Sequence, residues 1–367
     1  MITNIHLHNF RNYTDIDLPF TKSLVVLFGP NGAGKTNLLE AISMLAIGRG
    51  LRNATLPEIT NTASGAKETT WAVQMVLNNE IALSTGSALT ENNRFRRVCK
   101  IQGEFVKSAA KFHEYLNIIS ITPLMDHIFI DAPSIRRKFI DDLITSYSPE
   151  HSINLQQYEK AQKQRFSVLK SGPYDDKWLL LLEEIMAERS ILISAARNDF
   201  VERLNEGQAP YIPLFPRFYS KIVGKAENLT KDEIFTMLGQ NRERDKLAGI
   251  TTFGCHRSDW EVSHLCKNRV ARECSTGEQK ILLVSVILSF VNQQLKKNDT
   301  LIILLLDDVI ARLDASHRAV LFDQASEFRR GASSGLVQVF FTGTDAELFG
   351  PVADAQFLRI DRASVVI

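Results

Sequence analysis

The sequence predicts an α/β fold that is interrupted by a mainly helical insertion. Apolar stretches with the patterns of strands occupy residues 1–132 and return over 248–367, whereas apolar residues at helical spacing dominate 133–247. We therefore expect 1–132 and 248–367 to combine into one α/β head and 133–247 to form a helical arm. A chain of 367 residues is long enough for two or three such units.

Composition places the chain among ordinary globular proteins, with 44% hydrophobic and 23% charged residues. Its 43 basic and 42 acidic side chains neither indicate nor exclude nucleic acid, because a binding groove needs only a local patch. The four cysteines form no CxxC pair, so they indicate neither a zinc site nor a redox motif. Met1–Tyr13 lacks the pattern of a signal peptide, and Leu301–Leu306 is far shorter than the roughly 20 apolar residues of a membrane span. We expect a cytoplasmic protein with no membrane partner.

The head begins with strands. Ile16, Leu18 and Phe20 alternate with acidic residues, which is the period of a half-buried strand. A continuous apolar run, Ser23–Phe28, then ends at Gly29, as expected of a strand buried on both faces.

The insertion carries three long helical patterns, and Ser171-Gly-Pro interrupts the helical pattern between the second and the third. Thr230 and Glu233 have the spacing of a capping box before a shorter helix. No heptad pattern is long enough for an extended coiled coil. The long helices are expected at Ser134–Tyr147, Asn154–Leu169 and Lys177–Leu204.

A glycine-rich loop, GPNGAGKT, follows the buried strand and opens a helix that runs from Lys35 to about Ala46. It fits GxxxxGK[ST], in which glycines let backbone N–H groups converge on phosphate oxygens at a helix N-terminus. Lys35 would neutralise the β- and γ-phosphates, and the Thr36 hydroxyl would bind Mg²⁺. We therefore predict a Mg²⁺-ATP site formed by Gly29, Pro30, Asn31, Gly32, Ala33, Gly34, Lys35, Thr36 and Asn37.

A second acidic element follows the apolar run Leu301–Leu306, which reads as a buried strand. A carboxylate at the carboxyl end of such a strand lies beside the phosphate loop in this type of fold. Asp307 is therefore predicted to hold the metal, and Asp308 to orient the attacking water. In a sequence without the phosphate loop, we would interpret the two carboxylates as the solvent-exposed end of a strand.

The third element is the helix start Ser275-Thr-Gly-Glu-Gln-Lys, ahead of an apolar helix that ends near Leu295. Ser275 and Glu278 have capping-box spacing, so a well-capped helix explains them by itself. A helix start with Ser and Gly is also an anion site. It lies about 30 residues before Asp307, where ABC-type ATPases carry the signature helix that closes over the γ-phosphate of a partner subunit.

Motifs spread in order over the whole length resemble the RecF family, which belongs to the ABC group with Rad50 and the SMC proteins. The long coiled coils of Rad50 and SMC chains and the CxxC hook of Rad50 are missing here. The segments that carry the resemblance are Asn9–Tyr13, Asn37–Ala41, Arg49–Arg52, Pro133–Asp141, Gly254–Asp259, Ser275–Lys280, and Leu305–Val309 with Leu313-Asp314.

The resemblance implies an ABC-type (Rad50/SMC-like) head and an ATP-dependent homodimer that binds duplex DNA and the junctions of single-stranded gaps. It implies work with RecR and RecO to load RecA in DNA repair, replication restart and the SOS response, at the nucleoid. It also implies slow, DNA-stimulated ATP hydrolysis that ends DNA binding. In such a dimer Ser275, Gly277, Glu278 and Asp314 would meet the partner's nucleotide, and Arg11 would reach the α-phosphate unless it is a plain surface arginine.

The sequence departs from the family at three points. The usual Ser-Glu-Leu-Asp after the Asp pair is Ala311-Arg-Leu-Asp, and the usual Pro-Glu-Asp segment reads Pro123-Leu-Met-Asp. The first change affects the cross-subunit contacts of that loop, apart from Asp314, and the second affects the acidic role of its segment. The switch histidine of ABC transporters is absent, and Thr342 and Thr344 stand in its place.

Basic residues form two candidate DNA patches. Residues 90–111 hold six basic and two acidic side chains, a local charge of 6 − 2 = +4, and three basic residues in a row begin the arm. Such patches bind the DNA backbone in many proteins, although a charge run is more often a solvated face. The candidate contacts are Arg94, Arg96, Arg97, Arg136 and Arg137.

Three other function classes compete. A transporter ATPase subunit would carry its signature much closer to the phosphate loop, whereas Ser275 lies 275 − 35 = 240 residues after Lys35. A GTPase would carry a guanine-recognising NKxD motif, which is missing. An OLD-type nuclease would add a further carboxylate cluster, and none is evident in the sequence.

Overall fold

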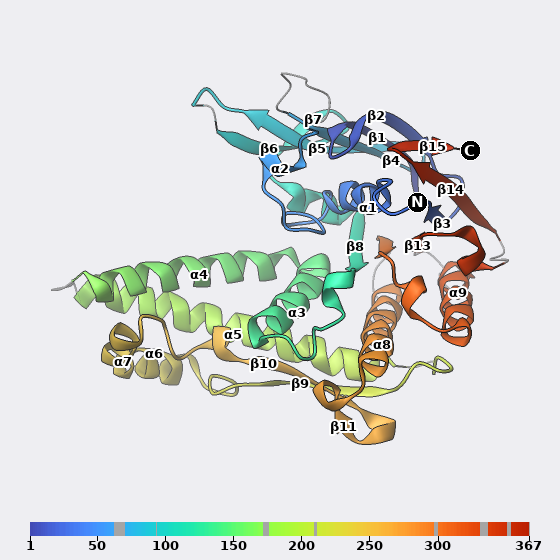
Figure 1. Ribbon diagram of the computed structural model, residues 1–367. Coiled ribbons are helices and arrows are strands. Elements are labelled where there is room, and N and C mark those ends of the chain that lie inside the picture. The colour runs from blue at the N-terminus through green and yellow to red at the C-terminus, as the bar shows by residue number, and fades with distance from the viewer. Residues whose placement is uncertain are drawn as a thin grey trace. The chain divides into compact units, whose positions relative to one another are not determined.

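The computed structural model describes residues 1–61, 70–92, 94–171, 176–208, 211–296, 300–330, 337–350 and 354–366. These residues divide into two compact units (Figure 1). The first contains Met1–Asp126, Ile212–Phe215 and Gln294–Ile367, and the second contains His127–Tyr211 and Pro216–Gln293.

The first unit contains a six-stranded sheet in which five neighbouring strands run parallel. The expected strand at Leu301–Leu306 is confirmed, and every residue in it is buried. Full burial explains why the sequence shows a continuous apolar run there and no alternation. The strand order is β15 (Ser364–Val366), β14 (Ala355–Asp361), β3 (Leu24–Phe28), β13 (Val337–Gly343), β12 (Leu301–Leu306) and β8 (Leu116–Ile121).

A second six-stranded sheet in the same unit is antiparallel throughout. Its strands bury alternate side chains against the core that the two sheets share, where the rings of Phe20 and Phe340 lie 5.1 Å apart. The order is β2 (Tyr13–Pro19), β1 (Ile2–Phe10), β4 (Ala72–Leu77), β5 (Ile81–Leu89), β6 (Phe95–Ile101) and β7 (Glu104–Val106). The α-helices of this unit are α1 (Lys35–Ser43), α2 (Leu56–Ile59) and α9 (Ala315–Arg330).

The second unit is mainly helical, as the sequence predicts. Its longest helices, α4 (Pro149–Lys170) and α5 (Asp176–Glu206), lie side by side (Figure 1). Gly172 and Pro173 of the predicted break lie outside the described residues. The capping box at Thr230 is confirmed. The other elements are α3 (Pro133–Tyr147), α6 (Lys231–Gln240), α7 (Arg242–Ala248), α8 (Thr276–Leu295) and a sheet of β11 (Arg269–Val270), β10 (Asp259–His264) and β9 (Phe218–Val223).

A buried ion network links α4, α5 and α7. Arg165 is fully buried and donates to Glu183 at 2.9 Å, to Asp245 at 2.6 Å and to the Leu238 carbonyl oxygen at 2.8 Å. Arg242 donates to the other oxygen of Glu183 at 2.6 Å. Removing one member of such a network leaves an unpaired buried charge, so the network fixes how these helices pack.

The compact units differ from the predicted domains in three places: residues 127–132 and 248–293 belong to the second unit, and Ile212–Phe215 belongs to the first. Residues 248–293 contain β10, β11 and most of α8, and they pack with the helical unit. Their strand-like sequence favoured the head, yet β10 pairs with β9 of the helical unit along its whole length. The division into head and arm at 132/133 and 247/248 stays a prediction about functional domains.

Candidate active site

The glycine loop connects β3 to α1 at the carboxyl edge of the parallel sheet. Gly29 has φ 145°, and a Cβ on it would lie 2.1 Å from the Ile360 carbonyl oxygen. Gly34 has φ 119°, and its Cβ would come within 2.8 Å of the Tyr13 hydroxyl. Only glycine fits both positions, because other residues add a side chain and disfavour positive φ.

Residues that follow β1 brace this loop. The Tyr13 hydroxyl donates to the Gly34 carbonyl oxygen at 3.0 Å, and the Asn12 amide donates to the Ala33 carbonyl oxygen at 3.2 Å. The braced loop and the N-terminus of α1 form one side of a cavity of about 210 Å³.

Lys35 begins α1 and lines this cavity. Its Nζ donates to the carbonyl oxygens of Gly29 at 2.6 Å and Pro30 at 2.8 Å. Burial lowers the pKa of Lys35, whereas the nearby Asp308 and Asp307 carboxylates act to raise it. The ammonium group is therefore held beside the loop by uncharged acceptors.

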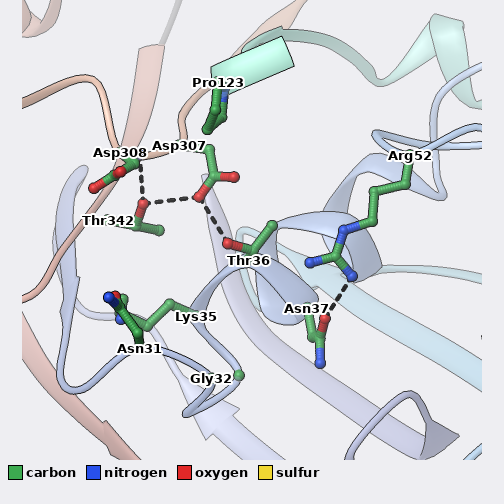
Figure 2. A pocket seen from close by; sticks show the side chains of 11 residues that line it. Asn31, Gly32, Lys35, Thr36, Asn37, Arg52, Pro123, Asp307, Asp308 and Thr342 are labelled. Atoms are coloured by element: carbon green, nitrogen blue, oxygen red, sulfur yellow. Dashed lines mark hydrogen bonds between the residues drawn. The ribbon is translucent and has the colours of Figure 1, made fainter. Parts of the chain in front are cut away.

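Asp307 directly follows β12 and accepts hydrogen bonds from two threonines (Figure 2). Thr36 Oγ1 and Thr342 Oγ1 both donate to Asp307 Oδ1, at 3.0 Å and 2.9 Å. Burial raises the pKa of Asp307, and the two hydroxyl groups act against that rise. Within the described part of the chain, Oδ2 of Asp307 accepts no hydrogen bond, so one carboxylate oxygen is free to bind a cation. Carboxylate and hydroxyl oxygens are the ligands Mg²⁺ prefers, so the residues present fit this ion.

Asp308 lines the same cavity and its side chain is 44% exposed. Its backbone has φ 55°, a conformation that is uncommon for a non-glycine residue, and its N–H donates to Thr342 Oγ1 at 2.7 Å. Arg312 Nη2 lies 3.6 Å from Asp308 Oδ2, and the same guanidinium pairs with Asp126. Arg312 and Asp126 lie in the two segments that depart from the family pattern, and they form an ion pair beside Asp308.

Arg52 is a residue of the cavity that the sequence argument missed. Its guanidinium donates to Asn37 Oδ1 at 2.8 Å and to Glu40 Oε2 at 3.1 Å, and the side chain lines the cavity (Figure 2). In the sequence, Arg52 stands out only as part of the segment Arg49–Arg52 that resembles the RecF family. The second arginine of this segment is a cation within the phosphate cavity.

Arg11 does not line the cavity, so its expected contact with the α-phosphate is not supported by the geometry. Its guanidinium forms a two-point pair with the fully buried Glu40, at 2.8 Å and 2.5 Å, and donates to the Glu58 carbonyl oxygen at 2.7 Å. A buried carboxylate needs such a partner, which explains the position of Arg11.

The start of α8 forms the predicted capping box. Glu278 accepts from the Ser275 N–H at 2.8 Å, and the Glu278 N–H donates to Ser275 Oγ at 3.4 Å. The hydrogen bond with Lys267, and then those that the Ser275 N–H and hydroxyl group donate to the carboxylate, lower the pKa of Glu278 to about 2. Ser275 and Gly277 are exposed, and a Cβ on Gly277 would meet nothing within 4 Å. The helix start is therefore ordered and accessible, but it belongs to the second compact unit.

Asp314 caps α9. It accepts from the His317 N–H at 2.9 Å and lies 2.7 Å from His317 Nδ1, and the first of these bonds is the main reason why its pKa is lowered. Asp314 and Thr344 are exposed. The contact of Asp314 with a partner's nucleotide and the role of Thr344 in place of the switch histidine stay predictions.

The basic candidates divide by exposure. Arg94 and Arg96 are exposed. Arg97 is instead directed into the first unit, where it donates to backbone carbonyl oxygens. Arg136 forms a two-point pair with Asp259, at 2.7 Å and 2.8 Å, and Arg137 donates to the Ser258 carbonyl oxygen at 2.5 Å. The geometry therefore gives Arg97, Arg136 and Arg137 internal partners and does not support them as contacts to DNA phosphates.

Among the helices that the structure describes, none is both long enough and apolar enough to cross a membrane.

Comparisons with known proteins agree with this architecture. Residues 1–354 match the model of the RecF/RecN/SMC N-terminal domain. The chain resembles the solved structure of the recombination mediator protein RecF-ATPrS in the RecFOR pathway, with a TM-score of 0.82, 23% identity, and coverage of 100% of this chain and 97% of that chain. It also resembles an Smc head bound to the C-terminal winged-helix domain of ScpA, with a TM-score of 0.51, 14% identity, and coverage of 100% and 96%. The ABC-type head predicted from the sequence is thus confirmed.

Two bacterial relatives, both named DNA replication and repair protein RecF, are similar over nearly their full length. The relative from Mesorhizobium japonicum is 37% identical, with 99% of this chain and 97% of the relative covered. The relative from Brucella abortus is 37% identical, with 98% and 94% covered. From this similarity and the matching domain model, we conclude that the chain belongs to the RecF family of DNA replication and repair proteins.

Proposed function

We propose that the chain is a slow, DNA-stimulated ATPase whose ATP-bound form dimerises on DNA. The observation that carries this proposal is the cluster of Thr36, Asp307 and Thr342 at the edge of the parallel sheet, beside Lys35 and the glycine loop. Thr36 and Asp307 would hold Mg²⁺, which would supply positive charge to the phosphate oxygens of ATP. The solved structures titled RecF-ATP and RecF-ATPrS support ATP as the nucleotide.

The chain's own residues supply binding and positioning. Backbone N–H groups of the glycine loop and the N-terminus of α1 face the phosphate groups, and Lys35 adds a cation. Asp308, half-exposed at the cavity, is placed to orient the attacking water and accept its proton. Such preorganised charge is the main source of catalysis in phosphoryl transfer.

Dimerisation would complete the site. In this proposal Ser275 and Gly277 of one subunit cover the γ-phosphate bound by the other, Glu278 caps the helix, and Asp314 adds a further contact with the partner's nucleotide. The exposed and capped start of α8 supports this role, since backbone N–H groups at a helix N-terminus bind anions.

Ser275→Arg tests the dimer. The larger side chain should block the approach of a partner's phosphate, so we expect monomers that bind ATP with an affinity within about threefold of wild type. Sedimentation velocity with ATP, with ADP and without nucleotide measures whether the protein is a monomer or a dimer. Arg244→Ser, on the exposed face of α7, is the control. ATP-dependent dimers of Ser275→Arg would refute the role in trans.

Within a pathway, we propose that the dimer binds duplex DNA and the junctions of gaps, and that it acts with RecR and RecO to load RecA in repair, replication restart and the SOS response. The family membership and the solved neighbours' titles, which place RecF in the RecFOR pathway, support this. The function would place the protein in the cytoplasm at the nucleoid. We expect ATP turnover to rise with gapped DNA while both DNA strands stay intact. A transporter subunit would not show this stimulation, and a nuclease would cut the DNA.

The exposed part of the first basic patch is the proposed DNA contact. Each phosphate contact contributes about 0.9 to the slope of log K against log salt, so Arg94→Glu with Arg96→Glu should lower that slope by about 2 and weaken binding at least about tenfold. Fluorescence anisotropy of a labelled duplex over a salt series measures both quantities. Arg244→Glu with Lys246→Glu, two exposed residues of α7, makes the same charge change as a control. An unchanged slope in the first variant would exclude the patch.

A further inference from the structure

Arg97 connects the antiparallel sheet to the chain that follows the phosphate-loop helix. On β6 it points away from the solvent-exposed Arg96, as alternation along a strand requires. Its Nη1 donates to the Gly48 carbonyl oxygen at 2.6 Å, and its Nη2 donates to the carbonyl oxygens of Met44 and, at 3.3 Å, Ala46. Nε donates to Thr85 Oγ1 at 2.9 Å. One guanidinium therefore ties β5 and β6 to residues 44–48.

The carbonyl oxygens that Arg97 meets belong to the C-terminal end of α1 and the turn after it. The last carbonyl groups of a helix lack intrahelical donors and carry partial negative charge, which a cation compensates. Arg97 appears in no ion pair among the described residues, and the acceptors of its guanidinium are three backbone carbonyl oxygens and Thr85 Oγ1. A planar fork of five N–H donors suits this task, and a lysine ammonium group does not match it.

The segment anchored by Arg97 leads directly to Arg52. Leu51 N–H donates to Ser43 Oγ at 2.8 Å, which folds the segment back on the end of α1. Arg52 then reaches Asn37 and Glu40 and lines the phosphate cavity. Residues 44–52 are thus held at one end by Arg97 and at the other by the contacts of Arg52.

We infer that Arg97 is a positioning residue for ATP hydrolysis: it fixes residues 44–52 so that the Arg52 guanidinium meets the phosphate groups in the cavity. The inference rests on the proposed ATPase function, and it gives Arg97 a role within the head in place of the DNA contact expected from the basic run. Arg52 is the group that touches the nucleotide, and Arg97 acts through it.

Two variants of the whole chain, Arg97→Gln and Arg97→Lys, test the inference by comparison with the wild-type protein. Lys35, Thr36 and the glycine loop stay intact in both, so ATP affinity, measured by titration with a fluorescent ATP analogue, should stay within about threefold of wild type. A misplacement of about 1 Å at a reacting group costs up to about 100-fold, so kcat should fall at least about tenfold. Arg97→Lys should not restore it. Arg244→Gln, the same change at an exposed arginine of α7, should keep the wild-type kcat.

A double-mutant cycle with Arg52→Ala separates positioning from general stability. If Arg97 acts through Arg52, kcat of Arg52→Ala with Arg97→Gln equals that of Arg52→Ala alone within about threefold, because the effects of coupled residues do not add. If the fold-losses in kcat of the two single variants multiplied in the double variant, the inference would be overturned. So would a wild-type kcat in both Arg97 variants, or a loss of ATP binding along with hydrolysis. DNA affinity should not change in the Arg97 variants, whereas a contact with DNA phosphates requires that it fall.

Thr85→Val keeps the test decisive if both Arg97 variants fail to fold. It removes one acceptor of the Arg97 guanidinium with little change of side-chain shape, so a smaller but measurable fall in kcat at unchanged ATP affinity is expected. No change in kcat would then contradict the inference. In wild-type protein, failure to bind or hydrolyse ATP at all would sink the proposed function, which is a different outcome from a failure of these variants.

Discussion

Lys35→Ala is expected to abolish measurable ATP binding. The ammonium group lines the phosphate cavity from the first residue of α1, and only backbone carbonyl oxygens hold it there. Alanine removes the cation that would face the β- and γ-phosphates, so we expect the Kd to rise at least about 100-fold, or about 3 kcal/mol. Titration calorimetry with ATP and Mg²⁺ measures this change.

The control for Lys35 is Lys22→Ala, which removes an exposed ammonium group of the same unit whose partner is Asp354. Its ATP affinity should equal that of wild type. A thermal melt of Lys35→Ala without nucleotide should also match wild type, because the Lys35 side chain makes no ion pair among the described residues that the fold would lose. Wild-type ATP affinity in Lys35→Ala would refute the site.

The sequence could predict the ATP site because its parts are local. Each half consists of a buried strand followed directly by the functional residues: β3 with the glycine loop, and β12 with Asp307 and Asp308. Parallel strands place their carboxyl ends at one edge of a sheet, so two local signals 271 residues apart predict one site. The hydrogen bond from Thr36 to Asp307 shows that the two elements lie side by side in the structure.

Arg11, Arg52 and Arg97 were harder to assign because a guanidinium can serve distant partners. Arg11 and Arg52 share the buried Glu40, which lies 29 residues from one and 12 from the other. No local pattern shows which of the two lines the cavity. For Arg97, alternation along β6 did hold a signal, since it falls on the same strand face as the buried Cys99. A basic run looks like a solvated or DNA-binding face until the strand register is known.

The boundary of the helical unit shows the same limit. Residues 248–293 have strand-like patterns that resemble the head, and β10 is indeed a strand. Its partner β9 lies in the insertion, and the sequence does not show which strands pair. Long-range pairing therefore decides the unit to which a short strand belongs, whereas periodicity decides only that it is a strand.

Asp308→Asn should separate nucleotide binding from hydrolysis. The amide keeps the size of the carboxylate but cannot accept the proton of an attacking water, and such a loss costs about 10²–10⁴-fold in rate. We therefore expect ATP binding and ATP-dependent dimers to persist while turnover falls by at least about 100-fold. Single-turnover hydrolysis of labelled ATP, alongside sedimentation with ATP, measures both.

Asp307→Asn gives the contrast that makes this result specific. Asp307 accepts the Thr36 and Thr342 hydroxyl groups and would hold the metal, so its amide should weaken Mg²⁺-dependent ATP binding and hydrolysis together. Asp323→Asn, an exposed carboxylate of α9, controls for the loss of one negative charge. If Asp308→Asn turned over ATP at the wild-type rate, the water-orienting role would pass to another group. If it also lost ATP affinity, the two carboxylates would share one role, and the division of labour between neighbouring residues at the end of β12 would be wrong.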